Sequence, residues 1–340
     1  TSATGTVVAV EGRRMIDLVA EQTPLGGLER WLHDPSVTEV MVNGGQHVWV
    51  ERRGQLELVG TMRPATVMAA IEHMLVPVGR RLDRSHPTVD ARLADGSRLC
   101  ASIDPVAVDG PCLSIRRFAA TAFPLAAFAN GSVSDLLRTV VRHRCNVIVS
   151  GATSSGKTTL LNALAQLVEP HARIITLEDV AELRLDHPHV LRFETRDATP
   201  DGVGEVTLAH LLRTALRMRP DRLVVGEVRG GEAVHLLQAL NTGHDGSLCT
   251  VHANSAVDAL TRLSTLVMHE AGGWPMAAVV RHVARAVDVV VHLARCPDGS
   301  RRVVEVVEVA ELHAVESPTF EVRPLAADRA VVGVLQRTRA

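Results

Sequence analysis

Aromatic residues are scarce in this sequence: tyrosine is absent, and aromatic residues make only 2% of the 340 positions. Proteins that bind single-stranded nucleic acid combine a basic groove with aromatic side chains on which the bases stack. The formal net charge is -2, so the basic excess is missing as well. We therefore do not expect nucleic acid as a partner.

Long apolar runs are absent too, whereas a membrane-spanning helix needs about 20 apolar residues in succession. The first residues, TSATGTVVAVEGRR, lack the basic and then apolar pattern of a secretory signal. We expect a cytoplasmic protein that acts at a membrane only through a partner. The five cysteines are scattered without a CxxC spacing, which argues against a disulfide framework or a zinc ribbon.

Lysine is nearly absent: of the 36 lysine and arginine residues, only Lys157 is a lysine. The compact ammonium group of lysine and the planar guanidinium group of arginine are not interchangeable where a point charge is required. In a chain so rich in arginine, we expect position 157 to need an ammonium group.

The pattern along the chain predicts two domains, which the length also favours. Residues 1–118 are typical of a small α+β domain, with strands around Gly44 and Gly45, further strands within 89–104 and 112–118, and a helix at 64–83. Residues 119–132 are uncharged, with glycine and proline, as in a linker. Residues 133–340 alternate between helix and strand. Such alternation predicts an α/β domain with a largely parallel sheet covered on both faces.

The segment GATSSGKTT at 151–159 matches the phosphate-loop pattern G-x-x-x-x-G-K-[ST], with an apolar strand before it and a helix after it. In such a loop, backbone N–H groups and the helix N-terminus face the nucleotide phosphates. Lys157 would neutralise the β- and γ-phosphates, and Thr158 would ligate Mg²⁺. The residues predicted to bind the nucleotide are Gly151, Ala152, Thr153, Ser154, Ser155, Gly156, Lys157, Thr158 and Thr159.

Carboxylates end two of the predicted strands: Glu178 and Asp179 end the strand at 173–179, and Glu227 ends the strand at 222–227. The carboxyl ends of parallel strands face the crevice in which such sheets bind ligands. One acid can orient the attacking water while the other serves the metal, and either residue fits either role. A guanine-reading N-K-x-D motif would need a second lysine, so we expect ATP rather than GTP.

These motifs resemble those of the type II and type IV secretion ATPases of the GspE/PulE-type superfamily, and within them the CpaF-like ATPases of tad-type pili and conjugation-like export systems. The resemblance extends from residue 38 to residue 309 and includes three further segments: TLEDVAEL at 176–183, RPDRLVVGEVRGGEA at 219–233 and NTGHDGSLCTVHAN at 241–254. The sequence departs from the family at Ser154, where these proteins often have glycine.

The resemblance implies a RecA-like P-loop NTPase domain, a smaller N-terminal domain, and a hexameric ring with ATP between the two domains. It implies that His252 senses the γ-phosphate and that His244 lies near the nucleotide. A buried structural histidine is one alternative. Zinc ligation by His244, Cys249 and His252 is another, which strand alternation opposes because Cys249 and His252 would face opposite sides.

An arginine from a neighbouring subunit can stabilise the charge that phosphoryl transfer leaves on the γ-phosphate. In the family such residues come from the end of the N-terminal domain, where Arg92, Arg98, Arg116 and Arg117 cluster in this sequence. We select Arg98 and Arg116.

The sequence thus predicts an ATP-hydrolysing motor for secretion or pilus assembly. Thr158 and Glu227 would hold Mg²⁺, and Glu178 would polarise the water. We expect a homo-oligomer, a hexamer, on the inner face of the membrane, bound to an inner-membrane platform protein. The alternatives are a nucleic-acid-translocating P-loop ATPase and a nucleotide-binding scaffold without hydrolysis.

Overall fold

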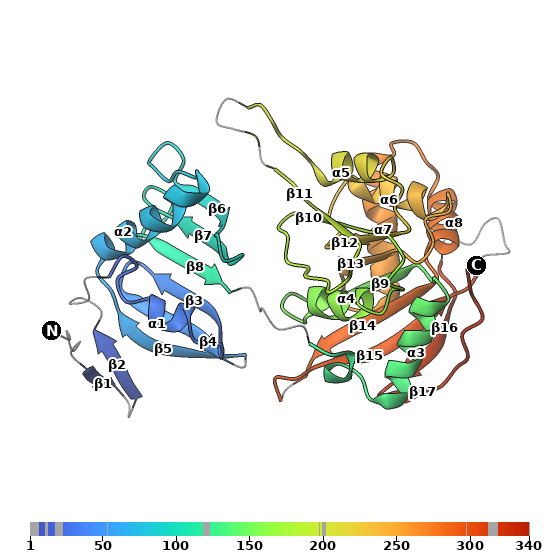
Figure 1. Cartoon of the computed structure of the whole chain (residues 1–340), viewed down its shortest axis with the longest axis horizontal. Helices are drawn as coiled ribbons and strands as arrows, with labels where there is room; N and C mark the ends of the chain where they lie inside the picture. The colour runs from blue at the N-terminus through green and yellow to red at the C-terminus, as the bar shows by residue number, and fades with distance from the viewer. Residues whose placement is uncertain are drawn as a thin grey trace. The chain divides into compact units, whose positions relative to one another are not determined.

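The computed structural model describes residues 7–10, 13–17, 23–52, 54–117, 123–196, 198, 202–296, 298–311 and 319–339. The chain divides into two compact units, Thr1–Ala120 and Thr121–Ala340, each built on its own sheet (Figure 1). Within the described ranges, every helix falls short of the length or the apolarity that a bilayer-spanning segment requires.

Among the described residues, the first unit contains an eight-stranded sheet in the order β1-β2-β5-β4-β3-β8-β7-β6. Its neighbouring strands are antiparallel apart from β2 and β5. The strands are β1 (Val7–Val10), β2 (Arg13–Asp17), β3 (Val37–Asn43), β4 (His47–Arg52), β5 (Gln55–Thr61), β6 (Thr88–Arg92), β7 (Arg98–Ser102) and β8 (Cys112–Arg116). The helices are α1 (Glu29–Leu32), α2 (Pro64–Leu75) and the 3-10 turn η2 (Val76–Val78). Helix α2 buries Val67 and Ile71 in the same core as Val40 of β3 and Leu99 of β7.

Local sequence explains most of this unit. Gly44 and Gly45 both have positive φ angles, 58° and 62°, which a tight hairpin turn between β3 and β4 requires. The predicted helix at 64–83 is too long, because α2 ends at Leu75 and Gly79, with φ 66°, closes the turn that follows.

The second unit contains, within the described residues, a nine-stranded sheet in the order β11-β10-β12-β13-β9-β14-β15-β16-β17. The strands are β9 (Val147–Gly151), β10 (Ile174–Glu178), β11 (Val190–Glu194), β12 (Arg222–Val225), β13 (Leu248–His252), β14 (Val289–Arg295), β15 (Arg301–Val309), β16 (Val322–Ala327) and β17 (Ala330–Val331). The strands from β11 to β14 in this order are parallel, and β15, β16 and β17 add an antiparallel extension. The predicted α/β class with a largely parallel sheet is confirmed.

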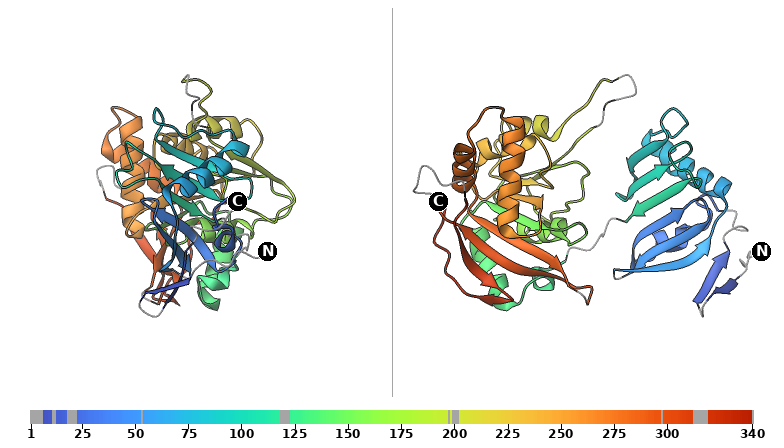
Figure 2. Two further views of the ribbon diagram at one scale, coloured as in Figure 1. Left: turned by 90° about the vertical axis from the view of Figure 1, so that its left-hand side faces the viewer. Right: turned by 180° about the vertical axis from the view of Figure 1, so that it is seen from behind.

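Helices cover both faces of this sheet (Figure 2). One face is covered by α5 (Leu208–Ala215), α6 (Glu232–Leu240), α7 (Ala256–Glu270) and α8 (Met276–Ala286). The other is covered by the 3-10 turn η3 (Leu125–Ala127), α3 (Gly131–Arg142) and α4 (Lys157–Ala165). Side-chain caps fix the starts of α3, α5 and α7, where Asn130, Thr207 and Ser255 each accept a backbone N–H.

The predicted linker at 119–132 is only partly described, since 119–122 lie outside the described residues. Leu125 and Phe128 are buried in the core of the second unit, and α3 already begins at Gly131. The sequence pattern does not predict β11, whose VLRFE segment lies at the sheet edge and buries none of its residues fully.

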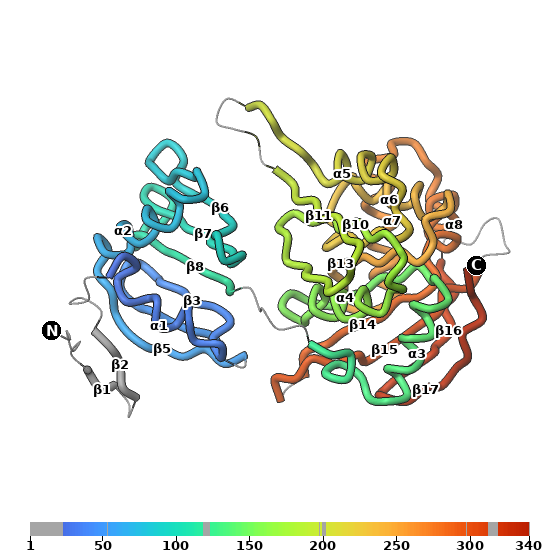
Figure 3. The backbone as a smooth tube through the Cα atoms, viewed as in Figure 1, coloured from blue at the N-terminus to red at the C-terminus, as the bar shows by residue number. Residues whose placement is uncertain are grey.

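The C-terminal residues 332–339 run back from β17 toward the end of α8 (Figure 3). Arg337 donates to the backbone carbonyls of Ala284 and Val287 and forms an ion pair with buried Asp288. The end of α8 therefore obtains hydrogen-bond donors from this tail.

Candidate active site

The predicted phosphate loop joins β9 to α4. All five residues of β9 are buried in the middle of the sheet, and α4 begins at Lys157 with Gly156 as its N-cap. Gly156 has φ 96° and Ser154 has φ 59°, so two positions of the loop adopt the left-handed conformation. The second value places Ser154 in a conformation that glycine adopts without strain and serine does not.

The glycines also make room for a neighbouring strand. A Cβ atom on Gly151 would collide with the Leu293 carbonyl oxygen of β14, and a Cβ atom on Gly156 would lie 2.8 Å from Cδ of Arg301. A side chain at position 151 would therefore displace β14 from the loop, whereas one at position 156 would displace the side chain of Arg301.

Lys157 is buried, although it carries the only ammonium side chain of the sequence. Its Nζ atom donates to the backbone carbonyls of Gly151 and Ala152, each at 3.0 Å. The ammonium group is thus folded back over the loop that it closes, and these carbonyls offset part of the cost of its burial. An anion in the loop would offer a stronger, charge-assisted acceptor.

The other loop residues differ in exposure. Ala152, Thr153 and Ser154 are exposed, and Thr158 and Thr159 are half-buried in the first turn of α4. Ser155 is buried, and its hydroxyl group has no hydrogen-bond partner within the described part of the chain.

His252 lies beside this loop. It is the last residue of β13 and pairs with Gly151 in the register between β13 and β9. Its Nδ1 atom is 3.4 Å from the Thr153 hydroxyl oxygen, within hydrogen-bond reach. The half-buried imidazole can therefore exchange a hydrogen bond with the loop itself.

Glu178 ends β10 and is 2% exposed. One of its carboxylate oxygens accepts the N–H groups of Glu182 and Leu183, both at 2.9 Å, and the other has no hydrogen bond among the described residues. Burial raises the pKa of Glu178 from 4.5 to about 7, despite these two N–H donors. A carboxyl group with this pKa can take up and release a proton near neutral pH.

Glu227 follows β12 and is more exposed, with 22% of its side chain accessible. It accepts a hydrogen bond from Arg229 Nη2 at 2.7 Å, and Arg229 Nη1 lies 3.7 Å from Asp179. The ion pair with Glu227 raises the pKa of Arg229. One guanidinium group thus connects the acids that follow β10 and β12.

Sequence reasoning did not select Glu232, whose buried carboxylate accepts the N–H groups of Arg229 and Gly230 at 2.5 and 2.8 Å. It holds the turn that carries Arg229. The sequence does indicate this role, because Glu232 stands at the start of a helix. An acidic residue in the first turn of a helix commonly binds the free N–H groups there.

A buried histidine next to the loop was also missed. His292 of β14 shares a 2.9 Å hydrogen bond with the hydroxyl group of Ser150, the residue before the loop, and burial lowers the pKa of His292. No sequence motif marks this pair, because it arises from the pairing of β9 with β14.

His244 and Cys249 do not join the site. His244 precedes β13, at the opposite end of that strand from His252, and its ring lies 3.2 Å from the carbonyl of Ala239 at the end of α6. Five strand residues span about 17 Å, so the structure does not bring His244 to the loop.

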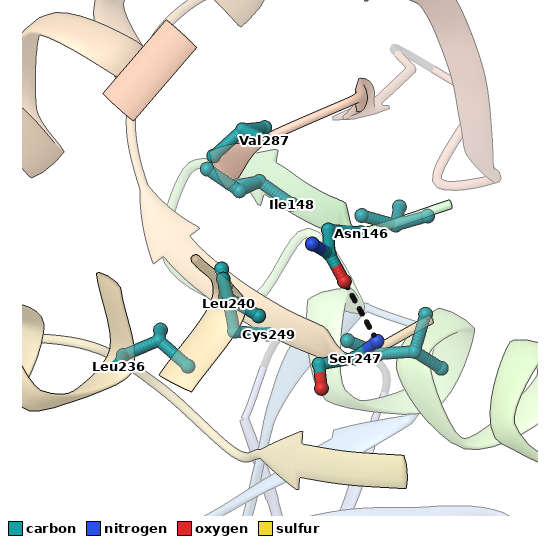
Figure 4. Close-up of a pocket in the computed structure, with 9 residues that line it drawn as sticks. Asn146, Ile148, Leu236, Leu240, Ser247, Cys249 and Val287 are labelled. Atoms are coloured by element: carbon teal, nitrogen blue, oxygen red, sulfur yellow. Dashed lines mark hydrogen bonds between the residues drawn. The ribbon is translucent and has the colours of Figure 1, made fainter. Parts of the chain in front are cut away.

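Cys249 is buried among Ile148, Leu236 and other apolar side chains that line a cavity of about 10 Å³ (Figure 4). Within the described ranges, no three His, Cys, Asp or Glu side chains are grouped to hold a metal, so zinc ligation has no support.

The predicted arginines belong to the first unit. Arg92, Arg98 and Arg116 pair with one another across β6, β7 and β8 in one row. Arg116 is exposed, and Arg98 is half-buried, 3.8 Å from Asp90. Arg117 differs, because it donates to the backbone carbonyls of Asp34 and Val37. Arg116 also pairs in register with Glu39 of β3, so this row of basic side chains has acidic neighbours.

Comparison with known proteins agrees with the motifs. A family model described as "Type II/IV secretion system protein" matches residues 21–336. A putative conjugal transfer protein of Mycobacterium tuberculosis is 40% identical over 328 residues, which cover 92% of this chain and 91% of that protein. The conjugal transfer protein TrbB of Rhizobium radiobacter is 36% identical over 287 residues, covering 82% of this chain and 85% of TrbB.

Two solved structures share the fold. The pilus retraction motor PilT with bound ADP has a TM-score of 0.59 at 21% identity, covering 83% of this chain and 81% of that one. The ATPase DotB of Legionella pneumophila has a TM-score of 0.58 at 18% identity, covering 85% and 82%.

Proposed function

Because the chain belongs to the type II/IV secretion system protein family, we propose that it binds and hydrolyses Mg²⁺-ATP at the 151–159 loop and uses the cycle to drive export, pilus assembly or conjugation-like transfer. The observation that carries the proposal is the placement of Lys157. The single lysine of the chain closes a loop flanked by His252.

The chemistry of one loop residue and of one residue that follows β12 fits a magnesium ion. Thr158 and Glu227 supply a hydroxyl and a carboxylate oxygen, the hard donors that Mg²⁺ prefers, and the Glu227 side chain is partly exposed. When bound, Mg²⁺ would neutralise charge on the β- and γ-phosphate oxygens.

We assign the proton transfer to Glu178. Attack of water on the γ-phosphorus forms one P–O bond and breaks the bond to the β-phosphate oxygen, so ADP leaves and the water loses a proton. A pKa of about 7 lets Glu178 accept that proton and release it again near neutral pH.

His252 would report the state of the γ-phosphate. The imidazole lies within reach of Thr153, so a hydrogen bond made to the phosphate competes with the one made to the loop. Loss of the phosphate would return His252 to Thr153 and change the loop conformation.

Arg98 and Arg116 would complete the site from a neighbouring subunit of a homo-oligomeric ring, for which we propose six subunits. An arginine supplied in this way can raise the rate by about 10³ to 10⁵. The ring would work in the cytoplasm, on the inner face of the membrane, against an inner-membrane platform protein.

The test is steady-state ATP turnover by the purified full chain with Mg²⁺. Lys157→Ala is expected to reduce turnover to background, and Lys157→Arg is expected to do the same because the buried position leaves little room for a guanidinium group. Added DNA is expected to leave the rate unchanged. Equal turnover by wild type and Lys157→Ala would contradict the proposal, and stimulation by DNA would favour a nucleic-acid motor.

A further inference from the structure

The phosphate loop has two different flanks, because β9 lies between β13 and β14 in the sheet. On one side, β13 carries His252, and beyond it β12 and β10 lead to Glu227 and Glu178. On the other side lie β14 and β15, which form an antiparallel hairpin. His252, Glu227 and Glu178, which are proposed to act at the γ-phosphate and the metal, therefore all lie on the first flank.

A nucleotide that places its γ-phosphate toward the acids must place its other end elsewhere. A triphosphate in a phosphate loop extends along the loop, with the γ-phosphate at one end and the nucleoside at the other. With the acids and His252 on the β13 flank, the nucleoside end would face the β14–β15 hairpin.

The β14–β15 hairpin brings the basic side chain of Arg301 to the phosphate loop. Leu293 of β14 pairs with Gly151, so β14 continues past the start of the loop to Arg295, which pairs with Arg301 of β15. The half-buried Arg301 side chain then packs on the loop: a Cβ atom on Gly156 would lie 2.8 Å from its Cδ and 3.7 Å from its Nε. Its stem occupies the space that the missing side chain of Gly156 leaves open.

A guanidinium group at this place suits a nucleotide. It offers several N–H donors in one plane to phosphate oxygens, and it stacks on the face of an aromatic ring. Arg302, the next residue, points to the other face of β15 and is tied to Asp298 in an ion pair, so it provides a matched comparison.

We propose that Arg301 contacts the nucleoside monophosphate end of ATP, from the same chain as the loop. This inference rests on the proposed nucleotide binding and adds a residue outside the phosphate-loop motif. It separates Arg301 from Arg98 and Arg116, which are proposed to act at the γ-phosphate from another subunit.

The test is the dissociation constant of the full chain, with Mg²⁺, for ADP and for a non-hydrolysable ATP analogue. Arg301→Met keeps the aliphatic stem that packs on Gly156 but removes the guanidinium group. This substitution is expected to raise the dissociation constants for both nucleotides by the same factor, about tenfold, as for the loss of one charge-assisted contact. Arg302→Met is expected to change neither affinity.

Two outcomes would overturn the inference: a loss confined to the ATP analogue, which would place the contact at the γ-phosphate, or unchanged affinity for both nucleotides. Thermal unfolding without nucleotide controls for folding. If Arg301→Met unfolds early, Arg301→Lys takes its place, and equal weakening of both nucleotides remains the expected result. If the wild-type chain binds neither nucleotide, the proposed function itself fails. If binding requires Lys157 but not Arg301, only this inference fails.

Discussion

His252, the last residue of β13, lies directly opposite Gly151, the first residue of the phosphate loop, and its Nδ1 atom is 3.4 Å from the Thr153 hydroxyl oxygen. A histidine in this position touches the loop rather than the core. It can therefore pass a change at the phosphate to the strand that carries it.

His252→Ala is expected to lower kcat by about ten- to a hundredfold while changing the KM for ATP little, because the contact is proposed to matter after the phosphate is bound. Steady-state kinetics across ATP concentrations measures the two parameters. His269→Ala, an exposed histidine at the end of α7, is the control and should leave both unchanged. A rise in KM with unchanged kcat would contradict the sensing role.

Glu178→Gln is expected to change how stability depends on pH. Burial raises the pKa of Glu178 from 4.5 to about 7, so the folded chain holds the proton more tightly than the unfolded chain does. Protonated Glu178 makes its full contribution to the free energy of unfolding below pH 4.5. This contribution is lost as the pH rises through 7, which lowers the free energy of unfolding by about 3 kcal/mol. Glutamine cannot ionise, and its carbonyl oxygen can still accept the N–H groups of Glu182 and Leu183.

The measurement is urea unfolding of both proteins at pH 5 and pH 8. The variant should gain stability relative to wild type at the higher pH. The same variant should keep its affinity for nucleotide and lose turnover. Parallel pH dependence in the two proteins would show that the carboxyl group is not held protonated by its burial.

A mixing experiment tests whether Arg98 acts across subunits. Arg98→Ala and Lys157→Ala proteins should each be inactive alone, and together they should recover part of the turnover, because a mixed ring contains sites with both an intact loop and an intact arginine. Arg117→Ala with Lys157→Ala is the comparison, since Arg117 binds carbonyls within its own unit. No recovery at any mixing ratio would count against an arginine supplied in trans.

Arg337→Ala is expected to lower the free energy of unfolding by about 3 kcal/mol, because it leaves the buried carboxylate of Asp288 with one guanidinium partner fewer. It also removes the donor to the carbonyls at the end of α8. Urea unfolding measures the effect. Arg262→Ala, an exposed arginine on α7, should be nearly neutral. Equal stability of the two variants would show that the C-terminal tail does not hold the domain together.

The sequence predicted the α/β unit well because its signals are local. Buried strands such as β9 are continuous apolar runs, and the loop motif fixes where α4 begins. Similar apolar runs predict where β10 and β13 end. The positions of Glu178 and His252 at these strand ends could therefore be predicted from the sequence alone. The roles assigned to these residues remain to be tested.

What the sequence could not give depends on pairing between distant segments. The contact of Arg301 with Gly156 and the Ser150–His292 hydrogen bond both require β14 and β15 to lie beside β9, which no motif encodes. His244 illustrates the converse. It shares a motif with His252, yet β13 holds the two at opposite ends of a strand. Gly79, which closes the 3-10 turn that follows α2, lies inside the range predicted as helix.

The most direct test of the account is isothermal titration of the full chain with a non-hydrolysable ATP analogue in millimolar Mg²⁺, for wild type and for Lys157→Ala. The account predicts saturable binding heat for the wild-type chain and none for the variant, because the single ammonium group neutralises the phosphates in the loop. No heat with the wild-type chain, or the same heat with both proteins, would contradict it.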